Sequence, residues 1–175
     1  SDLYVSQVAQ VVVNVAAAHA LFARHPHVFN TKRTQHHGAL PSAAGLSLGE
    51  VAAMTATGHL SLEDGLRVTH ERAKVFERLS SGQLASAKPQ GMCVVQGLER
   101  AEVETLCLLA RSRAGATDDD ELACSVGIDL FPRAVTVGGH RAALDVFVEL
   151  AKTAGAHKVR VLHENAAGHT EAIAR

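Results

Sequence analysis

The pentapeptide Gly45-Leu46-Ser47-Leu48-Gly49 has the form G-x-S-x-G of a nucleophile elbow. In such a turn a strand ends, a serine sits on a strained bend and a helix begins at once. Glycines flank the serine because the two backbones pass too close together for a Cβ atom at either position. The serine hydroxyl is then exposed, and the N–H of the next residue can point at a developing oxyanion. The motif predicts acyl transfer through a serine ester; the alternative is a helix N-cap beside a turn.

The elements expected around this serine are mainly helical. Apolar residues at helical spacing predict a buried helix over residues 6–24, with Ser6 as its N-cap. A polar loop should follow over residues 24–41, and residues 39–44 should form the strand that enters the elbow, although their strand propensity is low. Further helices are expected over residues 48–57 and 61–79, the second behind a capping sequence with acidic residues in its first turn.

The second half of the chain alternates between strand and helix patterns. A linker over residues 80–89 should lead into a β-α-β-β-α-β unit, which is the ferredoxin-like split arrangement. The expected elements are a strand at 92–97, a helix at 99–113, strands at 122–128 and 134–137, a helix at 141–154 and a strand at 158–162.

Composition limits the function classes. The chain has 175 residues, 47% hydrophobic and only 3% aromatic, so its core should consist mainly of Ala, Val and Leu. A net charge of −1 gives no reason to expect nucleic acid or an acidic membrane as partner, and no apolar run is expected to span a membrane. Three cysteines without C-x-x-C spacing (Cys93, Cys107 and Cys124) are expected to be reduced thiols, not a disulfide or metal site. No metal and no bound cofactor is expected, and the histidines at 25, 27, 36 and 37 are interpreted as part of a polar loop.

Several segments resemble, in sequence and in order along the chain, those of the malonyl-CoA:acyl-carrier-protein transacylases and the related acyltransferase domains of polyketide synthases. The resemblance extends over nearly the whole chain. It is carried by the segments 45–53, 58–67, Glu71-Arg72, 91–98, 130–132, 135–140 and Gly168-His169-Thr170. Because the family is longer at both ends, the match is expected to be partial.

The resemblance implies a role for four residues. Ser47 would be the nucleophile, and His169 its general base and then the acid that protonates the leaving thiolate. Arg72 would hold the free carboxylate of the malonyl group, which its planar guanidinium matches with two parallel hydrogen bonds. The Leu48 N–H would be half of the oxyanion hole.

The fold that the resemblance implies is α/β. A partial α/β-hydrolase-like large domain would hold residues 1–88 with the Ser47 elbow, an inserted ferredoxin-like subdomain would hold residues 89–163, and residues 164–175 would return to the large domain with His169. The reaction would move malonyl from CoA to Ser47 and then to the phosphopantetheine thiol of acyl carrier protein, in fatty-acid synthesis. The compartment would be intracellular, with the plastid favoured by Leu46 and the mitochondrion as the alternative.

Two other functions fit parts of the sequence. Departures from the family pattern at Val8, Ala73, 128–129 and 165–168 suggest a transacylase-derived structural or carrier-docking subunit of a larger assembly. A serine hydrolase would need an acid between serine and histidine in chain order, for which Asp145, Glu149 and Glu164 are available. The inserted subdomain fits the transacylase better.

Overall fold

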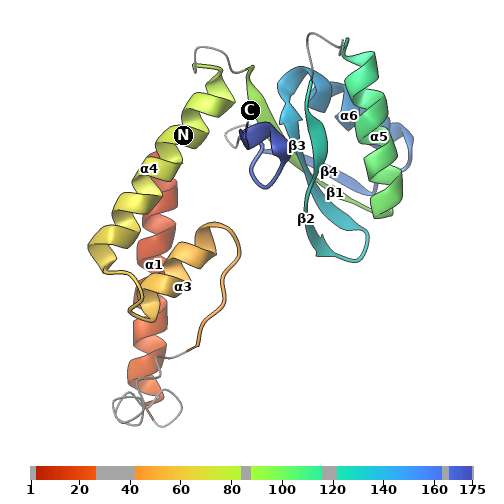
Figure 1. Cartoon of the computed structure of the whole chain (residues 1–175). Coiled ribbons are helices and arrows are strands. Elements are labelled where there is room, and N and C mark those ends of the chain that lie inside the picture. Colours follow the sequence, from red (N-terminus) through yellow and green to blue (C-terminus); the bar gives the residue numbers. More distant parts are fainter. Residues whose placement is uncertain (1–2, 27–41, 84–87, 116–121, 163–165, 175) are drawn as a thin grey trace. The chain divides into compact units, whose positions relative to one another are not determined.

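The computed structural model describes residues 3–26, 42–83, 88–115, 122–162 and 166–174 (Figure 1). The chain divides into two compact units, Ser1–Val75 and Phe76–Arg175. Each unit is described by itself.

The first unit contains helix α1 (Leu3–Arg24), helix α3 (Leu48–Ala56) and the beginning of helix α4 (Leu62–Ser81). Its small core joins Val11 and Val15 of α1 to Ala52 of α3, with Leu48 and Leu66 packed against them. The helix expected over residues 6–24 is confirmed, but its first turn is not where the sequence predicted. α1 begins at Leu3, and the Ser6 hydroxyl donates to the Leu3 carbonyl (3.1 Å) inside the helix, so Ser6 is not an N-cap.

Helix α1 is also more exposed than expected. Its buried residues follow one narrow i, i+4 stripe, whereas Val5 and Val13 are each 63% exposed. By length and composition alone the helix is apolar enough to cross a membrane, which corrects the expectation that no run reaches that length. Core helices of soluble proteins and signal sequences meet the same criteria of length and hydropathy. The Val11 and Val15 side chains of α1 lie in the core of this unit.

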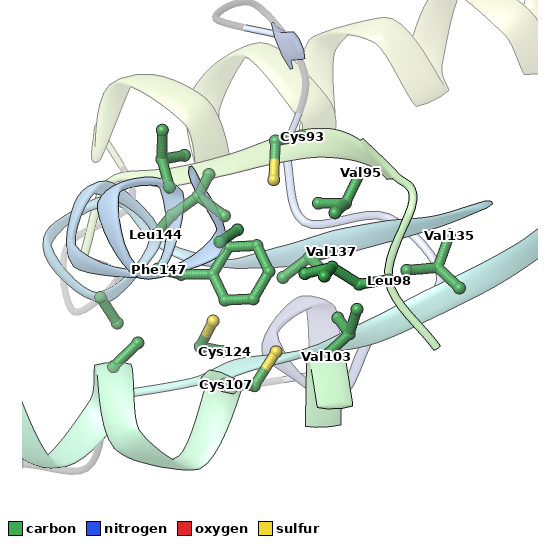
Figure 2. Close-up of a cluster of buried hydrophobic side chains, with 14 of the residues drawn as sticks. Cys93, Val95, Leu98, Val103, Cys107, Cys124, Val135, Val137, Leu144 and Phe147 are labelled. Atoms are coloured by element: carbon green, nitrogen blue, oxygen red, sulfur yellow. The ribbon is translucent and has the colours of Figure 1, made fainter. Parts of the chain in front are cut away.

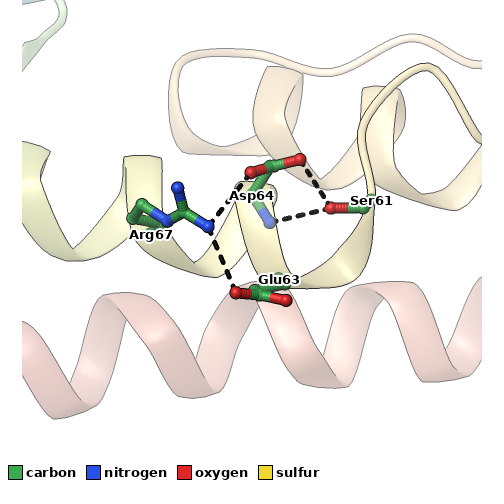
Figure 3. Close-up of polar contacts among 4 residues, drawn as sticks. All are labelled: Ser61, Glu63, Asp64 and Arg67. Carbon is green, nitrogen blue, oxygen red and sulfur yellow. Dashed lines mark hydrogen bonds and ion pairs between the residues drawn. The ribbon is translucent and has the colours of Figure 1, made fainter.

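Helix α4 begins where its capping sequence predicts. The Ser61 hydroxyl accepts from the Asp64 N–H (3.0 Å) and donates to the Asp64 carboxylate (2.7 Å), and Arg67 pairs with Glu63 at 3.1 Å one turn later (Figure 3). Gly65 faces Thr55 of α3, where an added Cβ would lie 2.3 Å from the Thr55 hydroxyl. The glycine therefore allows α4 to approach α3 closely.

The strand expected before the elbow is not formed in the described part of that segment. Residues 42–46 have no regular structure, and residues 39–41 lie outside the described residues, as do His27, His36 and His37. A strand needs a hydrogen-bonding neighbour, and the strands that the structure describes all belong to the sheet of the second unit.

The second unit follows the element order that the sequence predicts. It runs through β1 (Gln90–Gln96), α5 (Arg100–Arg113), β2 (Cys124–Phe131), β3 (Ala134–His140), α6 (Arg141–Thr153), β4 (Lys158–Leu162) and the 3₁₀-helix η1 (Glu171–Ala174). The strands form one antiparallel sheet in the order β2-β3-β1-β4. β3 is longer than predicted because it continues through Gly138 and Gly139. A Cβ at Gly139 would lie 2.2 Å from the Ala123 carbonyl oxygen, so this glycine marks a close backbone approach.

One face of the sheet is covered by α5 and α6. Phe147 and Leu144 of α6 lie fully buried among valines of β1 and β3 and the three cysteines (Figure 2). All seven residues of β3 are buried, so its second face is covered as well. Residues 166–174 provide that cover: Ala167 and Ala172 cluster with Ala123, and β3 contacts η1. The described part of the segment 164–175, for which the sequence predicts a return to the large domain, packs on the sheet of the Phe76–Arg175 unit.

Candidate active site

Ser47 occupies a strained bend immediately before α3. Its φ of 57° and ψ of −115° lie where residues with a side chain are uncommon. A Cβ at Gly45 would lie 2.0 Å from the Gly49 carbonyl oxygen, so this position admits only glycine. A Cβ at Gly49 would meet no described atom within 4 Å. The prediction that steric crowding requires glycine is therefore confirmed at position 45 and wrong at position 49. Such strain persists only where the surroundings hold it, which points to function.

The first turn of α3 places polar groups next to Ser47. The Ser47 N–H donates to Oε1 of Glu50 at 3.0 Å, which fixes the bend to the first turn of the helix. Leu48 is the first residue of α3, so its N–H has no acceptor within the helix. This is the position that an oxyanion-hole donor requires.

Arg72 of α4 contacts the serine directly. Its Nη2 donates to Ser47 Oγ at 3.1 Å, and its Nη1 donates to Oε1 of Gln7 at 2.7 Å. Half-burial of the guanidinium lowers the pKa of Arg72, and the nearby Glu50 carboxylate opposes this effect. The group stays a cation at neutral pH because an arginine pKa lies so high. The structure thus brings together two residues that are 25 positions apart in the sequence.

Gln7 is a site residue that sequence reasoning missed. It is 6% exposed and lies on the buried stripe of α1, between Leu3 and Val11. A single amide within an otherwise apolar stripe was the available signal, because a buried polar side chain needs a partner. Its partner is the Arg72 guanidinium, 65 positions along the chain.

His169 belongs to the other unit and is described there by itself. It is exposed and has a φ of 62°, in a turn closed by two short bonds: Gly168 N–H to Ala166 O (2.7 Å) and Thr170 Oγ1 to Ala167 O (2.6 Å). The turn leads directly into η1.

The three cysteines lie buried in the core of the second unit. Burial raises the pKa of Cys93 to about 12, and a hydrogen bond with Cys124, together with burial, raises the pKa of Cys107. Within the described residues, no group of three or more His, Cys, Asp or Glu side chains is arranged to hold a metal ion.

No protein-family model matches the chain. Curated relatives do. The human mitochondrial malonyl-CoA–acyl carrier protein transacylase is 30% identical over 129 residues, which cover 74% of this chain and 32% of that protein. The Staphylococcus aureus (strain MRSA252) transacylase is 31% identical over 121 residues, 67% of this chain and 34% of that protein. The chain is homologous to part of the malonyl-CoA–acyl carrier protein transacylases. It spans about a third of the length of these two relatives.

Solved transacylase structures share the fold. The Coxiella burnetii enzyme superimposes with a TM-score of 0.71 at 22% identity, covering 98% of this chain and 47% of that one. The Streptococcus pneumoniae enzyme gives a TM-score of 0.65 at 25% identity, covering 98% and 48%. The mixed α/β architecture is therefore that of part of a transacylase. The human and mouse relatives are named as mitochondrial, which supports the mitochondrial alternative and gives the plastid expectation no support.

Proposed function

We propose that this chain carries the acyl-transfer residues of a malonyl-CoA–acyl carrier protein transacylase. The observation that carries the proposal is the bond from Arg72 Nη2 to Oγ of a serine held at positive φ on the elbow. A cation beside a nucleophile suits an acyl group that ends in a carboxylate. The names of the homologues, which are transacylases of this kind, support the same reaction.

The proposed reaction has two half-reactions. Ser47 Oγ attacks the malonyl thioester carbon, His169 accepts the hydroxyl proton, and the C–S bond breaks as that proton passes to the CoA thiolate. The Leu48 N–H stabilises the oxyanion, and Arg72 exchanges its bond to the serine for a bidentate pair with the malonyl carboxylate. The phosphopantetheine thiol of acyl carrier protein then attacks the Ser47 ester by the same steps. No bound cofactor takes part.

Gln7 completes the proposed carboxylate site. Its amide oxygen holds one arm of the guanidinium, so the other arm stays directed at the serine. A guanidinium positioned in this way should prefer a malonyl group to an acetyl group, because only malonyl brings a carboxylate to it.

The finer description of the fold belongs to the same proposal. The antiparallel sheet order and the β-α-β-β-α-β sequence support a ferredoxin-like subdomain, and the elbow followed by α3 supports an α/β-hydrolase-like large domain. We propose a mitochondrial location from the names of the mammalian relatives. A transacylase of a type II polyketide system has been solved in complex with its acyl carrier protein, and we propose the same class of partner here.

The two competing functions are less well supported. A purely structural subunit would not need the direct contact between Ser47 and Arg72, and this contact is present. For a serine hydrolase, Glu149 is exposed and paired with Lys152 (2.7 Å), Asp145 is exposed on α6, and Glu164 lies outside the described residues.

The test is intact-protein mass spectrometry of the full chain mixed with malonyl-CoA. We expect one malonyl adduct that disappears in Ser47→Ala and persists in Ser42→Ala, a matched control in the exposed segment before the elbow. Acetyl-CoA should give much less adduct. An adduct that survives in Ser47→Ala, or equal labelling by acetyl-CoA, would overturn the assignment of the nucleophile or of the carboxylate site respectively.

A further inference from the structure

The side chain of Gln90 joins the His169 turn to the start of strand β1. Its Oε1 accepts a hydrogen bond from the Ala167 N–H (3.3 Å), and its Nε2 donates to the Ala172 carbonyl (2.6 Å). The two anchored residues lie on either side of His169 in the sequence. Gln90 is 1% exposed, so both ends of a buried amide are used to hold one short backbone segment.

The sheet provides space for this segment through two glycines. A Cβ at Gly138 would lie 3.0 Å from both Ala167 Cα and Thr170 Cγ2, and a Cβ at Gly127 would lie 3.3 Å from the Gly168 carbonyl oxygen. Side chains alternate between faces along a strand. Gln90 and Gly138 therefore share the sheet face opposite the one on which Cys93 and Val137 meet α5 and α6.

The turn needs this support for two reasons. His169 has a φ of 62°, and a non-glycine residue keeps such a conformation only where neighbouring groups over-determine it. In addition, Ala167 and Ala172 are fully buried, so their backbone polar groups would lack water if Gln90 did not pair with them.

We propose that Gln90 is a positioning residue for His169. By fixing the backbone on both sides of the histidine, it fixes the place from which the imidazole acts. This inference rests on the proposed function in one respect, namely that His169 is the general base. The two hydrogen bonds by which Gln90 holds the turn do not depend on that role.

The test compares three variants of the full chain. Gln90→Met keeps the length of the side chain and removes both hydrogen bonds. Thr170→Val weakens the same turn without changing the sheet, because it removes only the bond from Thr170 Oγ1 to the Ala167 carbonyl. Gln96→Met is the matched control, at the other end of β1 and on the same face as Gln90.

Two readouts report on position without requiring activity. Hydrogen exchange of the Ala167 amide should accelerate on the order of tenfold or more in Gln90→Met, with the amides of α5 and α6 unchanged. The NMR signals of the His169 ring should shift or broaden in Gln90→Met and, to a smaller extent, in Thr170→Val. Gln96→Met should match the parent chain in both readouts.

The third readout is malonyl transfer to Ser47. We expect its rate at saturating malonyl-CoA to fall by about 10-fold to 100-fold in Gln90→Met, with the half-saturating concentration unchanged, because a displaced base affects chemistry and not binding. If the parent chain is not malonylated, the proposed function fails. Hydrogen exchange and NMR still show whether the two bonds of Gln90 hold the His169 turn. Unchanged Ala167 exchange and unchanged His169 signals in a folded Gln90→Met would overturn the inference. If Gln90→Met does not fold, unchanged His169 signals in Thr170→Val would overturn it.

Discussion

The guanidinium of Arg72 donates both to the Ser47 hydroxyl and to the buried amide of Gln7, and under the proposed function this arrangement should set the preference for malonyl. Gln7→Leu removes the acceptor at 2.7 Å and leaves the Nη1 arm without that partner. Because a hydrogen bond to a charged group contributes about 1.5–3 kcal/mol, we expect the half-saturating malonyl-CoA concentration to rise on the order of tenfold. Gln10→Leu, on the exposed side of α1, is the control. An unchanged malonyl-to-acetyl ratio in Gln7→Leu would contradict this role.

The two glycines of the elbow should respond to alanine in opposite ways. Gly45→Ala places a Cβ 2.0 Å from a backbone oxygen, so the bend that carries Ser47 must move. A displacement of about 1 Å at a reacting group costs on the order of 100-fold in rate, which mass spectrometry of the malonyl adduct would resolve.

Gly49→Ala is the matched substitution, because it meets open space within the described residues. Gly49 is the second residue of α3, where alanine favours the helix over glycine by up to about 1 kcal/mol. We expect normal malonylation and equal or higher stability. Equal loss of activity in the two variants would show that the glycine pair acts through something other than steric fit at position 45.

Among the elements, α4 matters most to the site because it carries Arg72. Its N-terminus depends on the Ser61 hydroxyl, which accepts from the Asp64 N–H. Ser61→Ala should lower the free energy of unfolding by ~1 kcal/mol, as measured by urea denaturation followed by circular dichroism. Ser81→Ala, at the last residue of the same helix, removes bonds back to the Glu77 and Arg78 carbonyls of that helix and should have little effect. A larger loss in Ser81→Ala would contradict the importance of the cap.

Elements with strong local signals were predictable from the sequence. The capping sequence of α4 and the periodic apolar residues of α5 and α6 predicted helices whose bounds agree closely with the structure. The predicted strand at 134–137 is shorter than β3, which continues through Gly138 and Gly139 because these glycines admit neighbouring backbone. The predicted N-cap of α1 and the strand predicted to enter the elbow differ from the structure for another reason. Residue type alone favours Ser6 as the N-cap, whereas its hydroxyl donates to the Leu3 carbonyl inside the helix. A strand needs a hydrogen-bonding neighbour, which a local pattern does not identify.

The candidate site shows the same limit. Ser47 was predicted from its motif and Arg72 from the family resemblance, and the structure shows a direct contact between them. Gln7 and Gln90 were not found, because each acts through a partner 65 or more positions away. A glutamine has no motif of its own. Its role is visible only when the buried backbone or guanidinium group that it satisfies is known.

For the molecule as a whole, the core of the second unit contains two thiols, Cys93 and Cys107, whose pKa values are raised by folding. Burial raises the pKa of Cys93 from 9.0 to about 12, and contact with Cys124 raises that of Cys107. Since the folded-state pKa lies above the unfolded value, the stabilising contribution is fully present below about pH 9 and is lost as pH rises toward the folded pKa. In that window the unfolded chain releases thiol protons that the folded chain keeps.

The stability of the protein should therefore decline on the alkaline side, by up to ~1.4 kcal/mol per pH unit for each of these two thiols. Urea denaturation between about pH 9 and about pH 10, below the ordinary lysine pKa, measures the slope. Cys93→Ala should lower stability at neutral pH, because it leaves a small cavity in the buried cluster that contains Phe147, yet it should reduce the alkaline slope by the contribution of one thiol. The cavity lowers the stability at every pH, whereas the lost thiol changes only the slope of stability against pH. Equal slopes in parent and variant would therefore show that Cys93 ionises equally in the folded and unfolded chain.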